Sequence, residues 1–330
     1  MSAKGRTKMC TAVTMQGKHF YFGRNLDLAH SFGERVTLTP RGFELRFLAQ
    51  PAQSAHYAMI GTAAAEGLFP LYAEAMNERG LCAAGLYFPC SAAYGVRREG
   101  MYNVAPHEMI AWLLCRCANA AQAKLLLQNT CVIGEPFGAL PVAPLHWLVA
   151  DRTACFAVEP RADGLHLYDD PFGVLANEPP FEFHAENSKH YLNCTAEYPS
   201  SRFGLALEPY GLGLGAFGLP GDLSSASRFV RAAFYRANAG GAGESPEGEA
   251  VHFFHILGSV EVVRGGARER EGAPDETRYA CCMDADMGIY YKKEYDSGRI
   301  RAYALTGEAG DRLAVFLQPA GSGIEQAARP

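Results

Sequence analysis

Apolar runs at the start of the chain predict a β-hairpin with reactive side chains at its open end. Residues Met9 to Thr14 alternate small and β-branched side chains, and residues His19 to Gly23 supply a second apolar run after a Gln-Gly-Lys turn. The second run continues into Arg24 and Asp27, which the hairpin would bring beside Cys10. A thiol, a guanidinium and a carboxylate are therefore expected within a few ångströms of one another.

Helical and strand-like patterns alternate along the rest of the chain, which predicts layered packing of helices on sheets. The expected helices are about 106–117, 120–128 and 224–239, the last with Ser224 or Ser225 as its N-cap, and a short helix at 251–257. The expected strands are 145–150, 155–159, 165–168, 278–283, 288–291 and 301–304. Residues 240–248 are predicted to form a glycine-rich surface loop. Residues 193–221 form a weakly charged segment too long for an ordinary loop, and such segments usually have a function.

The composition is that of an ordinary globular chain of 330 residues, with 48% hydrophobic and 20% charged residues. No linker divides it, so a single domain is favoured. A formal net charge of −5 without a basic stripe argues against a nucleic-acid partner. No segment approaches the ~20 apolar residues that span a bilayer. The basic start, Met1 to Lys8, lacks the apolar stretch of a secretory signal, so we expect no membrane partner and predict the cytoplasm.

The ten cysteines fit a reducing compartment better than a disulfide framework. Most lie in apolar runs, where a reduced cysteine packs as a small core residue, and the adjacent Cys281-Cys282 suits core packing better than a disulfide. Cys115-Arg116-Cys117 lacks a second ligand pair, and His252 and His255 lack a nearby carboxylate. No phosphate-binding loop is present, so neither a metal nor a cofactor is expected.

Cys10 has two interpretations on pattern alone. A cysteine in an apolar run is most often a buried core residue. If the chain were cut before Cys10, however, the thiol would lie beside a free α-amine. Such an amine titrates at about pH 8 and can accept the thiol proton without a histidine. That is the chemistry of an N-terminal nucleophile amidohydrolase.

An ordered series of motifs resembles the choloylglycine hydrolase family, which comprises bile salt hydrolases and penicillin V acylases. The motifs cover nearly the whole chain, and the ordered set is far more specific than any one of them. They are MCT at 9–11, FGRNLD at 22–27, MNERGL at 76–81, LHW at 145–147, GVLANEP at 173–179, GLPGD at 218–222, SRFVR at 227–231, FFHIL at 253–257, CM at 282–283 and GIYY at 288–291.

This resemblance implies an α+β fold, a four-layer αββα sandwich of two antiparallel sheets with helices outside. It implies that Cys10 attacks the amide carbonyl, that Arg24 lies against the sulfur and that Asp27 bonds the terminal amine. A cation near the sulfur would lower the thiol pKa. On residue type alone, Arg24 would more often form an ion pair with Asp27.

The resemblance also assigns groups that would bind the reacting carbonyl. It implies that Asn177 donates to the oxyanion, with the backbone N–H of Tyr87 completing the hole, and that Arg228 is an active-site arginine. An asparagine in such a turn is usually there for turn chemistry, and Arg228 could be an ordinary helix-face residue.

The substrate pocket and the assembly also follow from the resemblance. It implies that Leu26, Phe137 and Leu140 line an apolar substrate pocket, although the last two could equally be core residues. In the family, the excursion corresponding to 193–221 packs against neighbouring subunits of a homotetramer.

Two departures from the family pattern affect the expected function. Many bile salt hydrolases have asparagine at the position of Tyr87, where penicillin V acylases commonly have tyrosine. Family members usually start Met-Cys, whereas here residues 1–9 precede Cys10; we expect their removal, leaving 10–330 as one domain. The leading hypothesis is hydrolysis of glycine- or taurine-conjugated bile salts. The alternatives are a penicillin V acylase and, if Cys10 stays blocked, a non-catalytic binder of amphipathic ligands.

Overall fold

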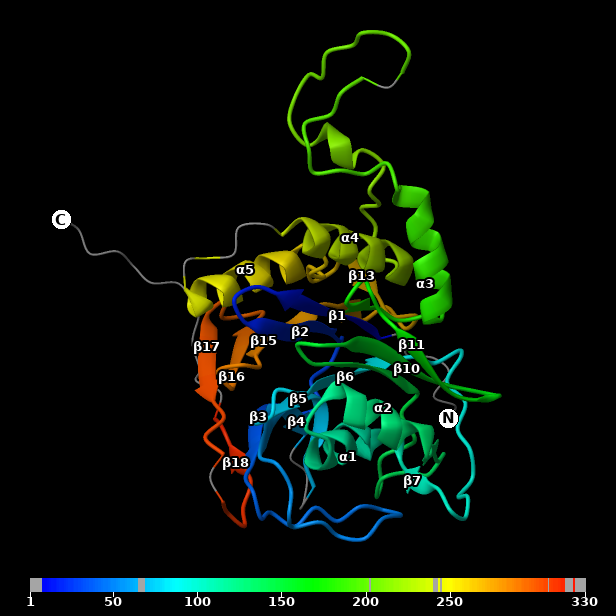
Figure 1. The fold of residues 1–330 in the computed structure, drawn as a ribbon, viewed down its shortest axis with the longest axis vertical. Helices are drawn as coiled ribbons and strands as arrows, with labels where there is room; N and C mark the ends of the chain where they lie inside the picture. Colours follow the sequence, from blue (N-terminus) through cyan, green and yellow to red (C-terminus); the bar gives the residue numbers. More distant parts are fainter. Residues whose placement is uncertain are drawn as a thin grey trace, which may run out of the picture.

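Two large antiparallel sheets face each other, with helices on both outer surfaces (Figure 1). The computed structural model describes residues 8–64, 69–201, 203–239, 243, 245–307, 309–317 and 323. Within them, α4 and α5 pack on one sheet and α1 and α2 on the other. The helices are α1 (Met109–Arg116), α2 (Ala120–Gln128), α3 (Phe181–Ser188), α4 (Ser225–Asn238) and α5 (Pro246–Gly258), with 3₁₀ turns at Pro106–Glu108, Lys189–Tyr191 and Leu214–Ala216. This is the predicted four-layer αββα sandwich, an α+β fold.

The strand order places sequence-distant segments side by side. The six-stranded sheet runs β12 (Val174–Leu175), β1 (Met9–Gln16), β2 (Phe20–Asp27), β15 (Thr277–Asp284), β16 (Ile289–Glu294), β17 (Ile300–Ala304). The eight-stranded sheet runs β11 (Gly164–Asp169), β10 (Cys155–Arg161), β9 (Leu145–Ala150), β6 (Cys82–Tyr87), β5 (Leu71–Asn77), β4 (Met59–Ala64), β3 (Glu34–Thr39), β18 (Ala314–Val315). Two small pairs are β13 (Ala267–Arg268) with β14 (Pro274–Asp275), and β7 (Tyr102–Val104) with β8 (Thr130–Val132).

The predicted hairpin is present and forms the centre of the six-stranded sheet. β1 pairs with β2 along its whole length, and every residue of β2 is buried because the other sheet covers one face and helices cover the other. Gly23 shows how close the helical layer lies: a Cβ there would stand 2.7 Å from the Phe253 ring of α5. The hairpin is therefore held rigidly from both sides.

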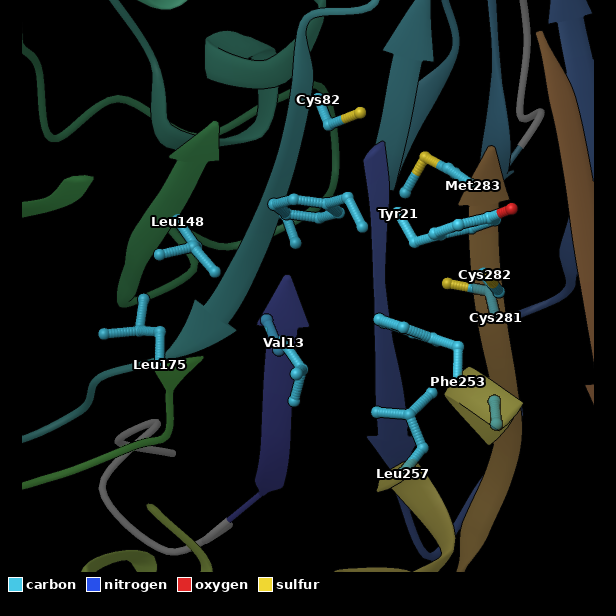
Figure 2. Packing of buried hydrophobic residues seen from close by; sticks show 14 of the residues in the cluster. Val13, Tyr21, Cys82, Leu148, Leu175, Phe253, Leu257, Cys281, Cys282 and Met283 are labelled. Carbon is cyan, nitrogen blue, oxygen red and sulfur yellow. The ribbon is translucent and has the colours of Figure 1, made fainter. Parts of the chain in front are cut away.

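The largest apolar cluster joins the two sheets to α4 and α5. Figure 2 shows part of it, with Val13 of β1 and Leu148 of β9 on one side and Phe253 of α5 on the other. Cys82, Cys281 and Cys282 are buried members, and all ten cysteines are free thiols, as the sequence indicated. A second cluster lies between the eight-stranded sheet and α1 and α2.

Helix boundaries confirm some predictions and correct others. α2 has the predicted bounds, and the hydroxyl of Ser224 caps α4 by accepting from Ser227 N. The predicted surface loop at 240–248 is wrong for its last residues, because α5 begins at Pro246 with Ser245 as its N-cap; residues 240–242 and 244 lie outside the described residues. α3 and strands β3 to β6 were not predicted.

The segment from 193 to 221 projects away from the sandwich beyond α3 (Figure 1). It has little regular structure apart from the 3₁₀ turn Leu214–Ala216. Several of its large apolar side chains are exposed, with Tyr210 91%, Leu212 88% and Phe217 85% accessible. The prediction of a long irregular excursion is confirmed.

Candidate active site

Cys10 lies at the open end of the β1–β2 hairpin, directly across from Leu26 of β2. Its side chain is buried, at 3% exposure. Its backbone nitrogen, which in this chain is an amide, donates to Asn177 Oδ1 at 2.7 Å. The thiol thus sits at a fixed point between the two sheets.

Arg228 reaches Cys10 from the first turn of α4. Its Nη1 donates to the Cys10 carbonyl at 2.6 Å and to the Thr11 hydroxyl, and its Nη2 donates to Asn177 Oδ1 at 2.9 Å. The guanidinium is 1% exposed, so Arg228 is not an ordinary helix-face arginine. Burial lowers its pKa, while Asp27 and Cys10 raise it.

Asn177 follows β12 and connects the nucleophile strand to β6. Its Nδ2 donates to the Tyr87 carbonyl at 2.8 Å, and its backbone N–H donates to Ser225 Oγ at 2.8 Å. His184 Nε2 bonds its carbonyl at 2.9 Å. An amide nitrogen carries two hydrogens, so Nδ2 keeps one N–H beyond its bond to Tyr87.

Arg24 is brought to the site by β2, but its acidic partner is Glu74 rather than Asp27. Its Nη1 donates to the Gly85 carbonyl at 2.5 Å and to the Ala73 carbonyl at 3.3 Å. Its Nε lies 3.8 Å from Glu74 Oε2, and both side chains are fully buried. The residue-type expectation of an Arg24–Asp27 pair is therefore wrong, because Arg24 points across to the eight-stranded sheet.

Asp27 lies opposite both Met9 and Thr277 in the sheet register, next to the bond that joins Met9 to Cys10. Its Oδ1 accepts from Thr277 Oγ1 at 2.6 Å, whereas Oδ2 is buried with no hydrogen-bond partner among the described residues. Burial raises the pKa of Asp27 to about 7, although Arg228 and the Thr277 hydroxyl act in the opposite direction. Oδ2 can therefore accept a further hydrogen bond.

The thiol is held in its neutral form by its surroundings. Burial raises the pKa of Cys10, and the charge of Asp27 adds to that, while Arg24, Arg228 and a hydrogen bond from the Tyr87 backbone lower it. Because burial is the largest effect, ionisation of Cys10 needs a base or a further cation nearby.

The predicted pocket residues lie in different surroundings. Leu26 is 5% exposed and belongs to the cluster between the sheets, whereas Phe137 and Leu140 are half-buried and pair with each other by an isolated bridge. Lys8 Nζ lies 5.6 Å from the centre of the Tyr87 ring. Burial lowers the pKa of His107, the charge of Lys8 adds to that, and the His107 ring is 6.4 Å from that of Phe137.

The described residues hold neither a metal cluster nor a membrane-spanning helix. No group of three or more His, Cys, Asp or Glu side chains there could hold a metal ion. None of the described helices has the length and apolar character needed to cross a membrane.

A model of linear amide C–N hydrolases, the choloylglycine hydrolase family, matches residues 10–313, so the match begins at Cys10. The chain belongs to this family. It is 40% identical over 314 residues to the bile salt hydrolase/transferase of Lactiplantibacillus plantarum, covering 94% of this chain and 97% of that protein.

A solved structure at 30% identity agrees with this membership. A variant of the conjugated bile acid hydrolase from Clostridium perfringens superimposes with a TM-score of 0.87 at 30% identity, over 96% of this chain and 99% of that one. Penicillin V acylase from Agrobacterium tumefaciens shares the fold at a TM-score of 0.73 and 19% identity, over 92% of this chain and 90% of that one.

Sequence reasoning missed the residues that support Asn177 in this family member. Glu178 Oε1 accepts from the backbone N–H groups of Cys90 and Ser91, each at 2.8 Å, and Oε2 accepts from Ser91 Oγ at 2.8 Å. Glu178 therefore links the turn after β6 to the segment that contains Asn177. The signal was available, because Glu178 directly follows Asn177 in the family motif.

Two buried histidines support the same segment and were also missed. His146 Nε2 bonds the Ala176 carbonyl at 2.8 Å, beside the His184 bond to Asn177. Burial lowers the pKa of His184 to about 4, so it is a neutral donor at physiological pH.

Proposed function

We propose that this chain hydrolyses the amide bond of glycine- or taurine-conjugated bile salts, with Cys10 as an N-terminal nucleophile. The observation that carries the proposal is the junction at Cys10: its backbone nitrogen bonds Asn177, Arg228 bonds both residues, and the family match begins at the same position. The substrate class comes from relatives named as bile salt and conjugated bile acid hydrolases.

The reaction requires a free amine at Cys10. Removal of residues 1–9 would convert the Cys10 amide nitrogen into an α-amine beside the thiol, bonded to Asn177 Oδ1. Asp27 lies opposite Met9 in the sheet register, and its Oδ2 has no hydrogen-bond partner among the described residues. Asn177 Oδ1 and Asp27 Oδ2 would orient the amine. In its neutral form the amine can take the proton of the buried Cys10 thiol, so it supplies the base.

Hydrolysis then proceeds through a thioester. The Cys10 sulfur attacks the amide carbonyl carbon, and the carbonyl oxygen becomes an oxyanion that receives N–H donors from Asn177 Nδ2 and the Tyr87 backbone. The α-amine, which has taken the proton of the thiol, gives that proton to the leaving nitrogen. The bond between the carbonyl carbon and this nitrogen breaks, and the amino acid departs. Water attacks the thioester with the same amine as base and releases the free bile acid. Arg24 and Arg228 stabilise negative charge on the sulfur and around it.

A penicillin V acylase is the second candidate, favoured by Tyr87. The backbone N–H of Tyr87 can donate to the oxyanion with either substrate. The Tyr87 side chain therefore affects which acyl group binds and leaves the reaction type unchanged. A steroid nucleus buries more apolar area than a phenoxyacetyl group, and burial contributes roughly 25 cal/mol per Å². Half-buried Phe137 and Leu140, beyond Lys8, would supply part of that apolar wall once residues 1–9 are gone.

Assembly and location are part of the same proposal. The apolar side chains exposed on the 193–221 excursion support a homotetramer in which each excursion packs on a neighbouring copy. Ten free thiols support a reducing compartment, the cytoplasm.

The deciding experiment compares substrates in parallel. Protein whose intact mass shows Cys10 at its start is assayed at one pH with glycocholate, taurocholate and penicillin V. We expect a higher kcat/KM for one or both bile salts than for penicillin V. The reverse ranking would move the chain to the acylase branch, and no turnover of any of the three would favour the binder hypothesis or a different acyl amide.

A further inference from the structure

Glu74 of β5 is a buried carboxylate that the mechanism above does not use. It is fully enclosed between the two sheets. Tyr279 donates its hydroxyl to Oε2 at 2.8 Å, and Tyr290 donates to Oε1 at 2.7 Å. The Tyr290 hydroxyl also contacts Thr62 Oγ1 at 2.6 Å. A carboxylate of the eight-stranded sheet is thus clamped by hydroxyls of the facing sheet.

The hydrogen bonds from Tyr279 and Tyr290 hold the Glu74 carboxylate beside Arg24. Three backbone carbonyls fix the Arg24 guanidinium, at residues 25, 73 and 85, so its position does not depend on Glu74. The 3.8 Å gap from Arg24 Nε to Glu74 Oε2 is too long for a hydrogen bond and suits a purely electrostatic pairing. Arg24 Nη2 is buried without a hydrogen-bond partner among the described residues.

Arg24 therefore faces two acidic groups, the Cys10 thiol and the Glu74 carboxyl. Burial lowers the pKa of Arg24, but the pKa is raised overall because Cys10 and Glu74, when charged, act more strongly in the other direction. A buried cation with one fixed counter-ion attracts a second anion less strongly than a buried cation with none. The charge of Glu74 thus limits how far Arg24 can stabilise the thiolate.

We propose that Glu74 is a positioning residue that acts through Arg24: as its fixed counter-ion, it sets the pH at which Cys10 ionises. The proposal rests on the proposed role of Cys10 as nucleophile. Burial raises the pKa of Glu74, whereas Arg24 and the hydrogen bonds from Tyr290 and Tyr279 lower it and so favour the ionised form. The two tyrosines also keep the carboxylate in place.

Other charged or titratable groups lie near Cys10 and near Glu74. Around Cys10 these are Asp27 of β2 and Arg228 of α4, besides Arg24. Around Glu74 they are Lys292 of β16, whose Nζ lies 4.4 Å from the centre of the Tyr279 ring, and the Cys281 thiol of β15. Besides the larger effect of burial, Glu74 raises the pKa of both Lys292 and Cys281, so a substitution at Glu74 also changes these two groups. Arg24 is the cation that faces both Glu74 and Cys10.

The test measures thiol ionisation directly. Wild type and Glu74→Gln, matched for their N-terminus by intact mass, are treated with iodoacetamide from pH 6 to 11, because burial raises the pKa of Cys10. Modification of Cys10 is followed by peptide mass spectrometry. The exposed Cys90 in the same protein is the internal reference. Loss of the carboxylate charge should lower the pH midpoint of Cys10 alkylation by about half a unit, which is about threefold in rate below the midpoint. The pH profile of kcat/KM should move in the same direction.

A matched control separates this effect from loosened packing. Glu249 is equally buried and accepts from the Lys18 backbone N–H at 3.0 Å, at the far end of the same hairpin. Glu249→Gln should leave the Cys10 midpoint unchanged. If Glu74→Gln does not fold, Tyr290→Phe removes one donor to the carboxylate and should shift the midpoint the same way by a smaller amount.

An unchanged midpoint in Glu74→Gln, or a midpoint that moves upward, overturns the proposal. An unchanged midpoint would mean that the charge of Glu74 does not alter the effect of Arg24 on the thiol. An upward shift would mean that Arg24 has moved away from the thiol. Alkylation needs no turnover, so a preparation that shifts its midpoint but hydrolyses no bile salt would contradict the proposed function alone.

Discussion

Asn177 Oδ1 lies 2.7 Å from the backbone nitrogen of Cys10, a residue 167 positions earlier in the chain. The same oxygen accepts from Arg228, and the Nδ2 of the same amide donates to the Tyr87 carbonyl. One short side chain therefore connects the nucleophile strand, the helical layer and β6. Its oxygen would orient the amine of Cys10, and its nitrogen would serve the oxyanion.

Asn177→Ala should lower kcat by about 100- to 1000-fold, equivalent to about 3 kcal/mol of transition-state stabilisation, with a smaller effect on KM. Asn177→Asp keeps an oxygen acceptor for the Cys10 nitrogen but loses the N–H donor, so it should be impaired to a similar extent. Steady-state kinetics on glycocholate measure both. Near-normal kcat in the aspartate variant would remove Asn177 from the oxyanion hole.

Cys10→Ala should abolish hydrolysis while leaving the fold and ligand binding largely intact, because the thiol has a chemical role. Cys10→Ser could keep only a trace of activity, since a hydroxyl ionises far less readily than a thiol. Product release, circular dichroism and calorimetric binding of a bile salt report the three properties. Unchanged turnover in the alanine variant would reject Cys10 as the nucleophile.

Active protein should begin at Cys10, since the proposed base is the α-amine of that residue. Intact mass of an active preparation should lack residues 1–9, and a preparation kept unprocessed should be inactive. The Lys8 contact with the Tyr87 ring adds a steric reason for the same outcome. Full activity in protein that retains Met1 would exclude the amine as base.

Local pattern predicted the parts of the fold whose periodicity is set by neighbours in sequence. The β1–β2 hairpin and α2 were predicted because each has its turn or its helical stretch close by. β4 and β5 were not, because both are covered on two faces and rich in alanine, which has a high helix propensity. Tertiary burial overrides the local preference there. The start of α5 was misplaced because glycines hid the Ser245-Pro246 helix-start signal.

In the candidate site, too, some residues could be predicted from the sequence and others could not. Motif resemblance nominated Arg24, Asp27, Asn177 and Arg228, and the fold brings all four around Cys10. The partner of Arg24 was missed, because Glu74 lies 50 positions away on the facing sheet and only sheet-on-sheet packing joins them. Contacts across layers leave no periodic trace in a single sequence.

Polar substitutions on the excursion should reduce the mass of the assembly. The triple variant Tyr210→Ser, Leu212→Ser and Phe217→Ser removes apolar area that is exposed in one copy and would be buried between copies. Light scattering should show tetramer for wild type and a smaller species for the variant. Val96→Ser, at a residue 81% exposed elsewhere on the surface, is the matched control and should stay tetrameric. A monomeric wild type would contradict the assembly outright.

Asp27→Asn should stabilise the unprocessed chain at neutral and alkaline pH. Burial raises the pKa of Asp27 from 3.8 to about 7 in the folded protein. The folded state therefore keeps the proton to higher pH than the unfolded state does. The resulting stability is fully present below about pH 4 and is lost as pH rises through about 7. Asparagine remains neutral throughout, so its advantage over aspartate should grow across that window, to at most about 4 kcal/mol.

Urea unfolding of Met9-retaining protein between pH 4 and 8 measures this difference. Asp222→Asn is the control with the opposite sign, because hydrogen bonds from Ser224 and Ser227 lower the pKa of Asp222 to about 2. It should show no such gain above pH 4. Asp27→Asn should also lose activity after processing, since the amide no longer offers the amine a charged acceptor. Unfolding free energies of wild type and Asp27→Asn that run parallel from pH 4 to 8 would show that Asp27 is not held neutral before cleavage. A stabilised but inactive variant would instead show that this carboxylate is kept, at a cost in stability, for the amine it meets once Met9 is gone.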